Sequence, residues 1–456
     1  MDKIQENILL LERGELLTTL ERNIFSTILS HCNDFNPPVV LRVAGGWVRD
    51  KLLGKESDDL DIAVENTTGI KFAEVLKNNT SNNVKVVVIE ANPDQSKHLE
   101  TARVCLFSDF WIDFCGLRSD EYAHESRIPK IRQGTPLEDA KRRDLTINAL
   151  FFNINENKIE DWTNGIEDLK NGIIRTPLEP IESFRDDPLR VLRSFRFASK
   201  LGFKLHESII PAAREIKEDF KRKIKRERIT TELLKAFNGK EPLNALKYLV
   251  ESELFDTVFD PEGRWNIDPN EALKRVLLVI NRYSHDNMFL VLTMSAIFAP
   301  IINQPKIADP ERKHKFINPI EYTVSRILKF PIKVSNDVHK ILKSAYDLGQ
   351  IKKPFTRLTI GNWIRKSGSL WIFANYLLFD ENQYNFYVNE IYPYIEEQQL
   401  QNCWEIKPLF KGAELAKIHN IKPGKKLKEY IEKLLDWQIE NPDGTKDEYI
   451  EYINKK

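Results

Sequence analysis

The spacing of apolar residues divides the 456-residue chain into two parts. In the first part, apolar residues alternate with polar ones or form short β-branched runs, which is typical of strands. We expect strands over 39–43, 60–64, 84–90, 101–107 and 111–117, with short helices over 47–53 and 69–77. Residues 3–33, and most of the chain after about residue 178, carry apolar residues at helical spacing. The pattern predicts an α+β domain with a five-stranded sheet, followed by an all-helical remainder.

The first expected strand ends in the dipeptide Gly45-Gly46, and a helical stretch follows it. Glycine adopts backbone angles that side chains forbid, so the chain can turn sharply here. A strand that ends in glycines and opens a helix directs bare backbone N–H groups at one place, which suits the oxygens of a triphosphate. Arg49 could add a positive charge there. A simple turn is the alternative on this pattern alone.

The second expected strand begins with two aspartates, Asp59 and Asp61, on either side of Leu60. Alternate side chains of a strand share a face, so both carboxylates point the same way. Two adjacent carboxylates are costly unless a cation joins them, and Mg²⁺ takes carboxylate and phosphate oxygens together. A solvated strand face is the alternative. The nearby glycine turn and a further aspartate, Asp113 in the strand 111–117, favour a metal site.

Two polar segments follow the expected strands. Residues of about 118–140 read as a long polar loop, which leads into the cluster Lys141-Arg142-Arg143-Asp144. Such a cluster is usually a solvated face. Asp144 and Asn148 are four residues apart, so one helical face could present both.

The segment 185–197 opens with acidic residues and a proline, as a helix does. Asp187 and Arg190 are three residues apart and would share a face. A capping acid with a salt bridge is one interpretation. The other is nucleobase recognition: cytosine and adenine present an amine donor beside a ring-nitrogen acceptor, which a carboxylate beside a guanidinium matches, while uracil and guanine do not fit.

These motifs together resemble a known family. GGWVRD followed by DDLDIA is similar to the class II tRNA nucleotidyltransferase and bacterial-type poly(A) polymerase superfamily, and KHLETA resembles the yeast-like, eukaryotic CCA-adding enzymes. RRDxxxNA, the segment 160–169, acid-Asp-x-x-Arg and ERxxxEL resemble the later family motifs, in order, over about residues 38–235. The resemblance implies a polymerase-β-like nucleotidyltransferase head domain followed by an all-α neck, body and tail.

The resemblance also implies a role for each matching residue. The catalytic residues would be Asp59, Asp61 and Asp113, with Mg²⁺ held by Asp59 and Asp61. Triphosphate and sugar would be bound by Gly45, Gly46, Arg49, Arg143, Asp144 and Asn148. The nucleobase would be read by Asp187 and Arg190, with support from Asp186, Arg193, Glu227 and Arg228. A flexible loop that helps the enzyme move from adding C to adding A would include Asp94, Lys97 and His98; an ordinary hairpin loop is the alternative.

The densest basic stretch lies at residues 217–228. We expect Lys221, Arg222, Lys223 and Lys225 to meet RNA phosphates, with an exposed helix of mixed charge as the alternative. Lys and Arg total 68 and so do Asp and Glu, so no overall positive charge indicates nucleic acid and any RNA contact must be local.

Composition limits the remaining possibilities. The four cysteines lie far apart without CxxC spacing, which argues against a disulfide framework or a zinc site and fits a reducing compartment. Acidic residues throughout the N-terminal stretch argue against a signal or transit peptide, and no apolar run reaches membrane-spanning length. We expect a soluble intracellular monomer without a membrane partner, in the cytoplasm, the nucleus or both, with the mitochondrion as a further candidate.

We expect four domains: a catalytic head at 1–177, a nucleobase-reading neck at 178–250, a body at 251–385 and a tRNA-binding tail at 386–456. The expected activity is template-independent addition of C, C and A to the 3′ end of tRNA from CTP and ATP. A poly(A) polymerase, or an enzyme that adds only CC or only A, shares the same motifs and stays an alternative. The intact Asp59 and Asp61 disfavour an inactive RNA-binding scaffold.

Overall fold

The computed structural model describes residues 3–57, 59–80, 84–89, 101–107, 110–121, 130–283, 288–422 and 424–455. The chain forms two compact units, Met1–Thr257 and Val258–Lys456. The boundaries of the four expected domains within these units stay predictions. The expected loop residues Asp94, Lys97 and His98 lie outside the described residues.

One seven-stranded sheet, in the order β3-β4-β5-β2-β1-β8-β9, organises the first unit. Its strands are β1 (Val40–Ala44), β2 (Leu60–Glu65), β3 (Lys85–Ile89), β4 (Thr101–Phe107), β5 (Phe110–Gly116), β8 (Phe151–Asn153) and β9 (Lys158–Glu160). Neighbouring strands are antiparallel except β2 and β5, which are parallel. The prediction of five strands was wrong by two. Strands β8 and β9 have three residues each, too few for alternation to be seen in the sequence.

The expected loop at 118–140 also proved to be structured in part. Strand β6 (Arg118–Glu121) pairs with β7 (Lys130–Gln133), and α5 (Pro136–Lys141) follows. Helix α5 begins with a capping box between Thr135 and Glu138 and with Pro136 in its first turn. The sequence did not reveal the strand pair or the helix, because neither has apolar residues at regular spacing.

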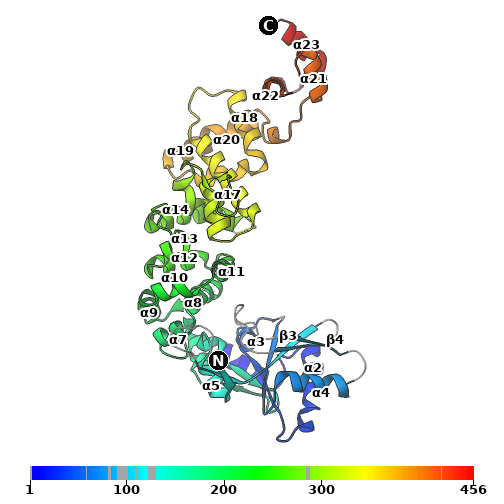
Figure 1. Cartoon of the computed structure of the whole chain (residues 1–456), viewed down its shortest axis with the longest axis vertical. Helices are drawn as coiled ribbons and strands as arrows, with labels where there is room; N and C mark the ends of the chain where they lie inside the picture. The colour runs from blue at the N-terminus through cyan, green and yellow to red at the C-terminus, as the bar shows by residue number, and fades with distance from the viewer. Residues whose placement is uncertain are drawn as a thin grey trace. The chain divides into compact units, whose positions relative to one another are not determined.

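Four helices lie against the sheet, where we expected helices within 3–33 and over 47–53 and 69–77; Figure 1 shows α2, α3 and α4 beside the strands. They are α1 (Lys3–Glu12), α2 (Thr19–Leu29), α3 (Gly46–Leu52) and α4 (Gly69–Asn79). Helix α4 packs on β3, β4 and β5. The buried Glu21 of α2 accepts hydrogen bonds from Trp47 Nε1 at 2.7 Å and Lys51 Nζ at 3.0 Å. The N-terminal helices thereby fix α3, which follows the glycine turn.

Short elements complete this region of the sheet. They are the 3₁₀ turns η1 (Cys32–Asp34) and η3 (Thr146–Asn148), the helix α6 (Gly165–Asn171), and the parallel pair β10 (Ile173–Ile174) and β11 (Lys204–Leu205).

The rest of the first unit is helical, and its central element is α8. The helices are α7 (Pro180–Asp186), α8 (Leu189–Leu201), α9 (Ile209–Glu215), α10 (Lys217–Lys223), α11 (Arg226–Phe237) and α12 (Pro242–Glu251), while α13 (Phe255–Phe259) contains the boundary between the units. Helix α8 packs against α7, α11 and α12, and most of its residues are buried. The single helix expected over 185–197 is interrupted, because Asp187 adopts extended backbone angles before Pro188.

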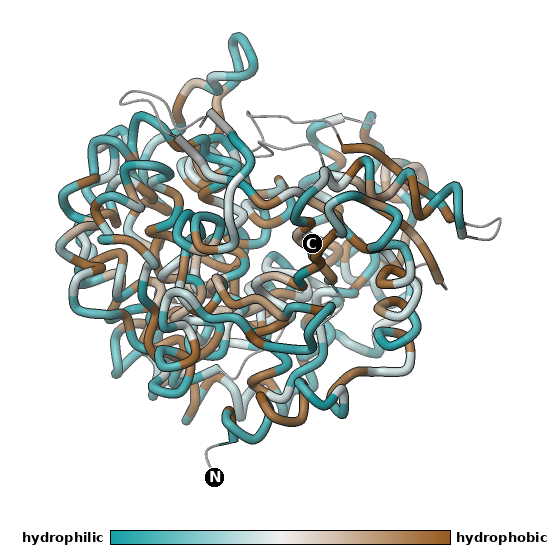
Figure 2. Tube along the Cα trace, turned by 90° about the horizontal axis from the view of Figure 1, so that it is seen from below, coloured by the Kyte–Doolittle hydropathy of each residue, from teal (hydrophilic) through white to brown (hydrophobic). Residues whose placement is uncertain are grey.

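The second unit is almost entirely helical, as expected. Its elements are α14 (Pro269–Arg282), α15 (Phe289–Phe298), η4 (Ala299–Ile301), β12 (Ile307–Ala308), β13 (Phe316–Ile317), α16 (Pro319–Glu321), η5 (Tyr322–Ile327), α17 (Ile332–Gly349), α18 (Arg357–Ser367), η6 (Gly368–Leu377), α19 (Glu381–Phe386), η7 (Tyr387–Ile391), α20 (Tyr392–Glu397), η8 (Cys403–Glu405), α21 (Gly412–Ile418), α22 (Lys425–Glu440) and α23 (Lys446–Asn454). Hydrophobic and hydrophilic residues alternate along the traces of both units (Figure 2), which is the pattern of amphipathic elements. None of the helices in the described part of the chain combines the length and the apolar character that crossing a membrane requires.

Candidate active site

A pocket of about 380 Å³ lies in the first unit, at the end of β1 and the start of α3 and β2, beside α8. It is lined by Gly45, Gly46, Trp47, Arg49, Asp50, Ser57, Asp59, Asp61, Arg143, Asp144, Asn148, Arg193, Arg196, Phe197 and Lys200. The pocket brings together Asp59, Asp61 and all the residues expected to bind triphosphate and sugar. It also includes Arg193, which was expected to play a supporting role.

Gly45 occupies a position that requires glycine. Its φ of +73° is unfavourable for other residues, and an added Cβ would lie 3.2 Å from Nη1 of Arg143 and 3.3 Å from the carbonyl oxygen of Asn148. Its own N–H donates to the carbonyl of Leu150 at 2.9 Å, which ties the turn to the sheet. The glycine turn therefore allows Arg143 to approach the backbone at the pocket wall.

The carboxylates of Asp61 and Asp113 lie on neighbouring parallel strands. The two residues are register partners in β2 and β5, so their side chains share one face of the sheet. Partial loss of hydration in the pocket raises the pKa of Asp61, and the nearby charges of Asp113 and Asp59 raise it further. Nε of Arg103 on β4 lies 3.4 Å from Oδ1 of Asp113, so Asp113 has a positive neighbour.

The donor set fits a hard cation. Negative charge is crowded at Asp61, and a divalent cation bound by Asp59 and Asp61 would relieve that crowding. Within the described residues, no group of three or more His, Cys, Asp or Glu side chains is arranged as a metal site. Asp59 and Asp61 can therefore supply part of a coordination shell that phosphate oxygens and water complete, as is usual for Mg²⁺.

A buried carboxylate, Asp139 on α5, orients the arginine at the pocket wall. Asp139 accepts from Arg143 Nε at 3.0 Å and also pairs with Arg142. Burial alone would raise the pKa of Asp139, but Arg143 and Arg142 lower it. The sequence reasoning missed Asp139 because it lies in the stretch read as a loop. The available signal was its three- and four-residue spacing to the two arginines on a capped helix.

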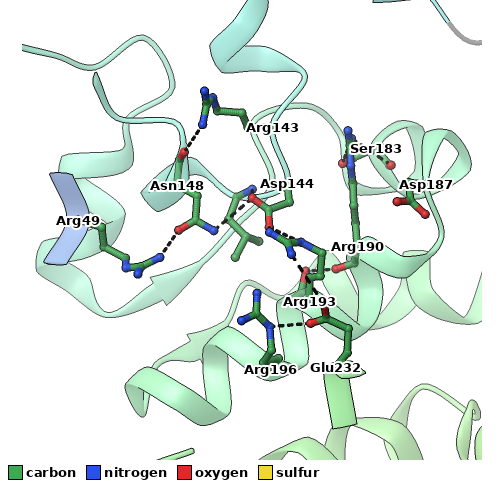
Figure 3. A network of polar contacts seen from close by, with 12 residues as sticks. Arg49, Arg143, Asp144, Asn148, Ser183, Asp187, Arg190, Arg193, Arg196 and Glu232 are labelled. Atoms are coloured by element: carbon green, nitrogen blue, oxygen red, sulfur yellow. Dashed lines mark hydrogen bonds and ion pairs between the residues drawn. The ribbon is translucent and has the colours of Figure 1, made fainter. Parts of the chain in front are cut away.

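A chain of contacts runs from α3 to the helices after the sheet (Figure 3). Arg49 Nη1 donates to Asn148 Oδ1, and Asn148 Nδ2 donates to Asp144 Oδ1 at 3.2 Å. Nε of Arg193 on α8 donates to Asp144 Oδ2 at 2.7 Å. Burial would raise the pKa of Asp144, but Arg193 and Asn148 together lower it to about 2. Asp144 and Asn148 do meet as expected, although through a 3₁₀ turn instead of a regular helical face.

Three arginines surround the ring of Phe197 in the same pocket. The guanidinium carbons of Arg196, Arg49 and Arg193 lie 4.0, 5.0 and 5.8 Å from the ring centroid. Glu232 on α11 holds two of these arginines, with one carboxylate oxygen 2.6 Å from Arg196 Nε and the other 3.9 Å from Arg193 Nη1 (Figure 3).

Arg196, Lys200 and Glu232 were missed as site residues. Arg193, Arg196 and Lys200 are spaced by three and four residues, which places them on one face of α8 and was a signal in the sequence. Burial, and then the positive charge of Arg49, lower the pKa of Lys200. The expected supporting residue Glu227 is exposed, whereas Glu232, within the same ERxxxEL segment, makes the bracing contacts.

Asp187 and Arg190 do not pair with each other through their side chains as the salt-bridge interpretation required. Asp187 accepts from Arg228 Nη2 at 2.7 Å and from the N–H of Leu189, the first residue of α8, at 3.1 Å. Arg190 Nη1 donates to Ser183 Oγ at 2.9 Å (Figure 3). Its Nη2 donates to the carbonyl of Arg142 at 2.5 Å. Neither Asp187 nor Arg190 lines the pocket of the carboxylates, and Asp186 and Asp113 do not line it either.

The basic stretch of α10 and its C-terminal end is partly exposed. Lys221, Arg222 and Lys225 are exposed, and Arg222 pairs with Asp219 at 2.9 Å. Lys223 is half-buried and donates to the carbonyl of Arg185 at 3.4 Å.

Comparisons with known proteins agree with this architecture. Residues 41–175 match the family described as the poly A polymerase head domain, and residues 202–265 match the one described as the probable RNA and SrmB-binding site of polymerase A. The mitochondrial CCA tRNA nucleotidyltransferase of Saccharomyces cerevisiae is 34% identical over 96% of this chain and 93% of its own length. The mitochondrial CCA tRNA nucleotidyltransferase of Candida glabrata is 33% identical over 94% of each chain. The CCA-adding enzyme of Thermotoga maritima, solved in complex with tRNA, has the same fold, with a TM-score of 0.68, 20% identity and coverage of 99% of this chain and 98% of that one.

The fold and the pocket define a polymerase-β-like nucleotidyltransferase head followed by helices. The chain belongs to the family of CCA tRNA nucleotidyltransferases, which are enzymes, and the resemblance seen in its motifs is confirmed. The predicted fold class is confirmed too. Nucleotidyltransferases of this family generally use a divalent metal ion.

Proposed function

We propose that this chain adds C, C and A to the 3′ end of tRNA, using CTP and ATP. The observation that carries the proposal is a pocket in which two carboxylates, Asp59 and Asp61, lie beside cationic side chains from α3, from the segment between α5 and η3, and from α8. Carboxylates that bind a metal ion beside fixed positive charge suit a nucleoside triphosphate and the negative charge that develops during nucleotidyl transfer.

The proposed reaction joins the 3′-hydroxyl of the RNA to the α-phosphorus of the nucleotide. Two Mg²⁺ ions bound by Asp59 and Asp61 would lower the pKa of that hydroxyl and neutralise the triphosphate. Asp113, beside Asp61 on the sheet, accepts the proton as the new phosphodiester bond forms and pyrophosphate leaves in line.

The triphosphate is held by backbone and arginine donors. Gly46 offers its N–H group at the start of α3, and Gly45, whose own N–H is bonded to the carbonyl of Leu150, makes the turn that brings Gly46 there. Arg49 and Arg143 supply charge, and each is already oriented by another group, Asn148 for Arg49 and Asp139 for Arg143. Asp144 and Asn148 serve the sugar. Orientation before binding reduces the entropy lost when the nucleotide arrives.

Base selection is assigned to Asp187 and Arg190. A carboxylate that accepts from an exocyclic amine and a guanidinium that donates to a ring nitrogen select C and A together. The separate anchoring of the two side chains supports this role, because each is held by groups other than the partner with which it would read the base.

RNA contact is proposed for Lys221, Arg222, Lys223 and Lys225. Their position within residues 202–265 and the exposure of Lys221, Arg222 and Lys225 support this assignment. Neutralising them should reduce affinity for tRNA in a salt-dependent way while leaving the KM for CTP unchanged.

The decisive experiment uses tRNA transcripts that end before CCA, after C and after CC. Each is incubated with Mg²⁺ and one labelled nucleotide at a time. C should enter the first two, A should enter only the third, and growth should then stop. Open-ended A tailing on these and on unrelated RNAs would instead identify a poly(A) polymerase. Incorporation of only CC or only A would identify a partial enzyme.

Two finer properties belong to the proposal. The first is a monomeric state, which light scattering of the purified enzyme tests. The two yeast relatives are named as mitochondrial enzymes, which supports a mitochondrial location for this chain, and imaging of the tagged protein tests it.

A further inference from the structure

The side chain of Arg190 is anchored on two sides. Its Nη1 donates to the hydroxyl of Ser183 at 2.9 Å and to the Ser183 carbonyl at 3.3 Å. Its Nη2 donates to the carbonyl of Arg142 at 2.5 Å. Arg190 is buried, so these contacts replace water as the partners of the charged group. They leave its Nε–H for another acceptor.

Ser183 can hold Arg190 because of the break between α7 and α8. The serine is fully buried, at 0% exposure, one turn before Asp187 ends α7. The extended backbone of Asp187 and the following Pro188 turn the chain, so that α8 returns Arg190 to the last turn of α7. In one continuous helix, residues 183 and 190 would lie on the same face, but each would contact only residues three or four positions away.

The contact between Arg190 and the carbonyl of Arg142 connects Arg190 to the side of the pocket that is proposed to bind the triphosphate. Arg142 and Arg143 are both held by Asp139, and Arg143 lines the carboxylate pocket. The guanidinium of Arg190 is therefore fixed between α7, through Ser183, and the segment that carries Arg143.

We infer that Ser183 is a positioning residue that sets nucleobase selectivity by fixing the guanidinium of Arg190. This inference rests on the proposed base-reading role of Arg190. A guanidinium distinguishes a ring-nitrogen acceptor from a ring N–H only when its donors have one direction, since a mobile arginine turns toward a carbonyl acceptor as readily. The Ser183 hydroxyl is the nearer of the two acceptors of Nη1, at 2.9 Å against 3.3 Å for the Ser183 carbonyl.

The test compares Ser183→Ala with Ser194→Ala. Ser194 is also buried at 0% exposure, and its hydroxyl donates to the backbone carbonyl of Arg190, so it controls for loss of a buried hydroxyl near the same residue. The measured quantity is the ratio of kcat/KM for CTP over UTP, and for ATP over GTP, on tRNA ending before CCA and after CC. Inhibition by inorganic tripolyphosphate measures separately how well the pocket binds a triphosphate, and thermal melting measures whether the variants are folded.

We expect Ser183→Ala to lower both discrimination ratios about tenfold, the effect of one hydrogen bond to a charged group. Tripolyphosphate inhibition should be unchanged, and Ser194→Ala should keep the wild-type ratios. Ser183→Cys, nearly isosteric with a weak acceptor, should give an intermediate ratio and serves if the alanine variant does not fold. Unchanged ratios in folded Ser183 variants would overturn the inference. Absence of C and A selectivity in the wild-type enzyme would instead refute the proposed function.

Discussion

Arg193 on α8 donates from Nε to Asp144 at 2.7 Å, and this contact joins the segment between α5 and η3 to the helical part of the same unit. Arg193 also lies 3.9 Å from Glu232 on α11, while Asp144 accepts from Asn148 at 3.2 Å. The arginine is thus shared between two buried carboxylates. An arginine suits this place because its planar group keeps its charge at any working pH.

Replacing Asp144 with Asn should destabilise the first unit by on the order of 2 kcal/mol at pH 7, given a pKa lowered from 3.8 to about 2. A depressed carboxyl pKa contributes stability that is complete above the unfolded value and is lost as the pH falls through the folded value. The difference between wild type and Asp144→Asn should therefore be constant from pH 7 to about 4.5 and shrink between about 4 and 2. Urea unfolding of both proteins at each pH measures it.

Asp219→Asn is the matched control for that experiment. The Asp219 carboxylate also pairs with an arginine, Arg222 at 2.9 Å, but on an exposed surface. Its replacement should cost less than about 0.5 kcal/mol at pH 7. An equal cost for the two variants would show that burial of Asp144 adds nothing.

Gly45→Ala should impair nucleotide binding more than Gly46→Ala does. The first substitution meets a φ of +73° and places Cβ 3.2 Å from Nη1 of Arg143, so both the turn and the arginine must shift. The Cβ that Gly46→Ala adds would have Nη2 of Arg49 as its nearest neighbour, at an ordinary van der Waals distance of 3.7 Å. We expect the KM for CTP to rise roughly tenfold or more for Gly45→Ala, since a left-handed non-glycine residue costs about 1–2 kcal/mol. Steady-state kinetics on tRNA lacking CCA measures this, and equal KM values for the two variants would contradict it.

The sequence predicted those parts of the site that lie on regular local patterns. The expected strands over 39–43 and 60–64 correspond to β1 and β2, and the alternation in β2 places Asp61 on the open face between the buried Leu60 and Ile62. The dipeptide Gly45-Gly46 predicted a sharp turn, because few residues besides glycine adopt the backbone angles of such a turn. Local periodicity is enough to orient a side chain relative to its own strand or helix.

Other features depend on contacts between distant segments, and these the sequence did not reveal. The pairing of Asp187 with Arg228 joins residues 41 positions apart, and that of Arg190 with the Arg142 carbonyl joins residues 48 apart. The spacing of Asp187 and Arg190 favoured a local pair instead. Asp187 and Arg190 do not pair because the helix is interrupted at Asp187. The sequence did not reveal this interruption, since a proline after two acidic residues is also how a continuous helix begins.

Replacing Phe197 should weaken nucleotide binding, because the guanidinium groups of three arginines lie around its ring. Phe197→Leu keeps most of the apolar volume but removes the π face that attracts the guanidinium groups. We expect the KM for CTP and ATP to rise about fivefold, within the range of cation–π energies, with little change in kcat. Phe195→Leu is the matched control, since Phe195 is buried on the same helix and packs on Tyr248 at 5.6 Å. A similar rise in KM for both variants would show that the effect is one of packing.

Asp187→Ala should lose selectivity for C and A while keeping affinity for the triphosphate. The carboxylate is the proposed acceptor for the exocyclic amine, and it does not line the pocket in which Asp59, Asp61 and Arg143 lie. UTP and GTP should therefore be incorporated more readily relative to CTP and ATP, whereas inhibition by tripolyphosphate stays near the wild-type value. The loss of a hydrogen bond between a charged acceptor and the base predicts a fall in discrimination of about ten- to a hundredfold. Glu182→Ala removes an exposed carboxylate from the same helix, α7, and should leave both measurements unchanged. If Asp187→Ala weakens tripolyphosphate inhibition as much as it weakens discrimination, then Asp187 supports the site as a whole through Arg228, and reading of the base must be assigned elsewhere in α7 or α8.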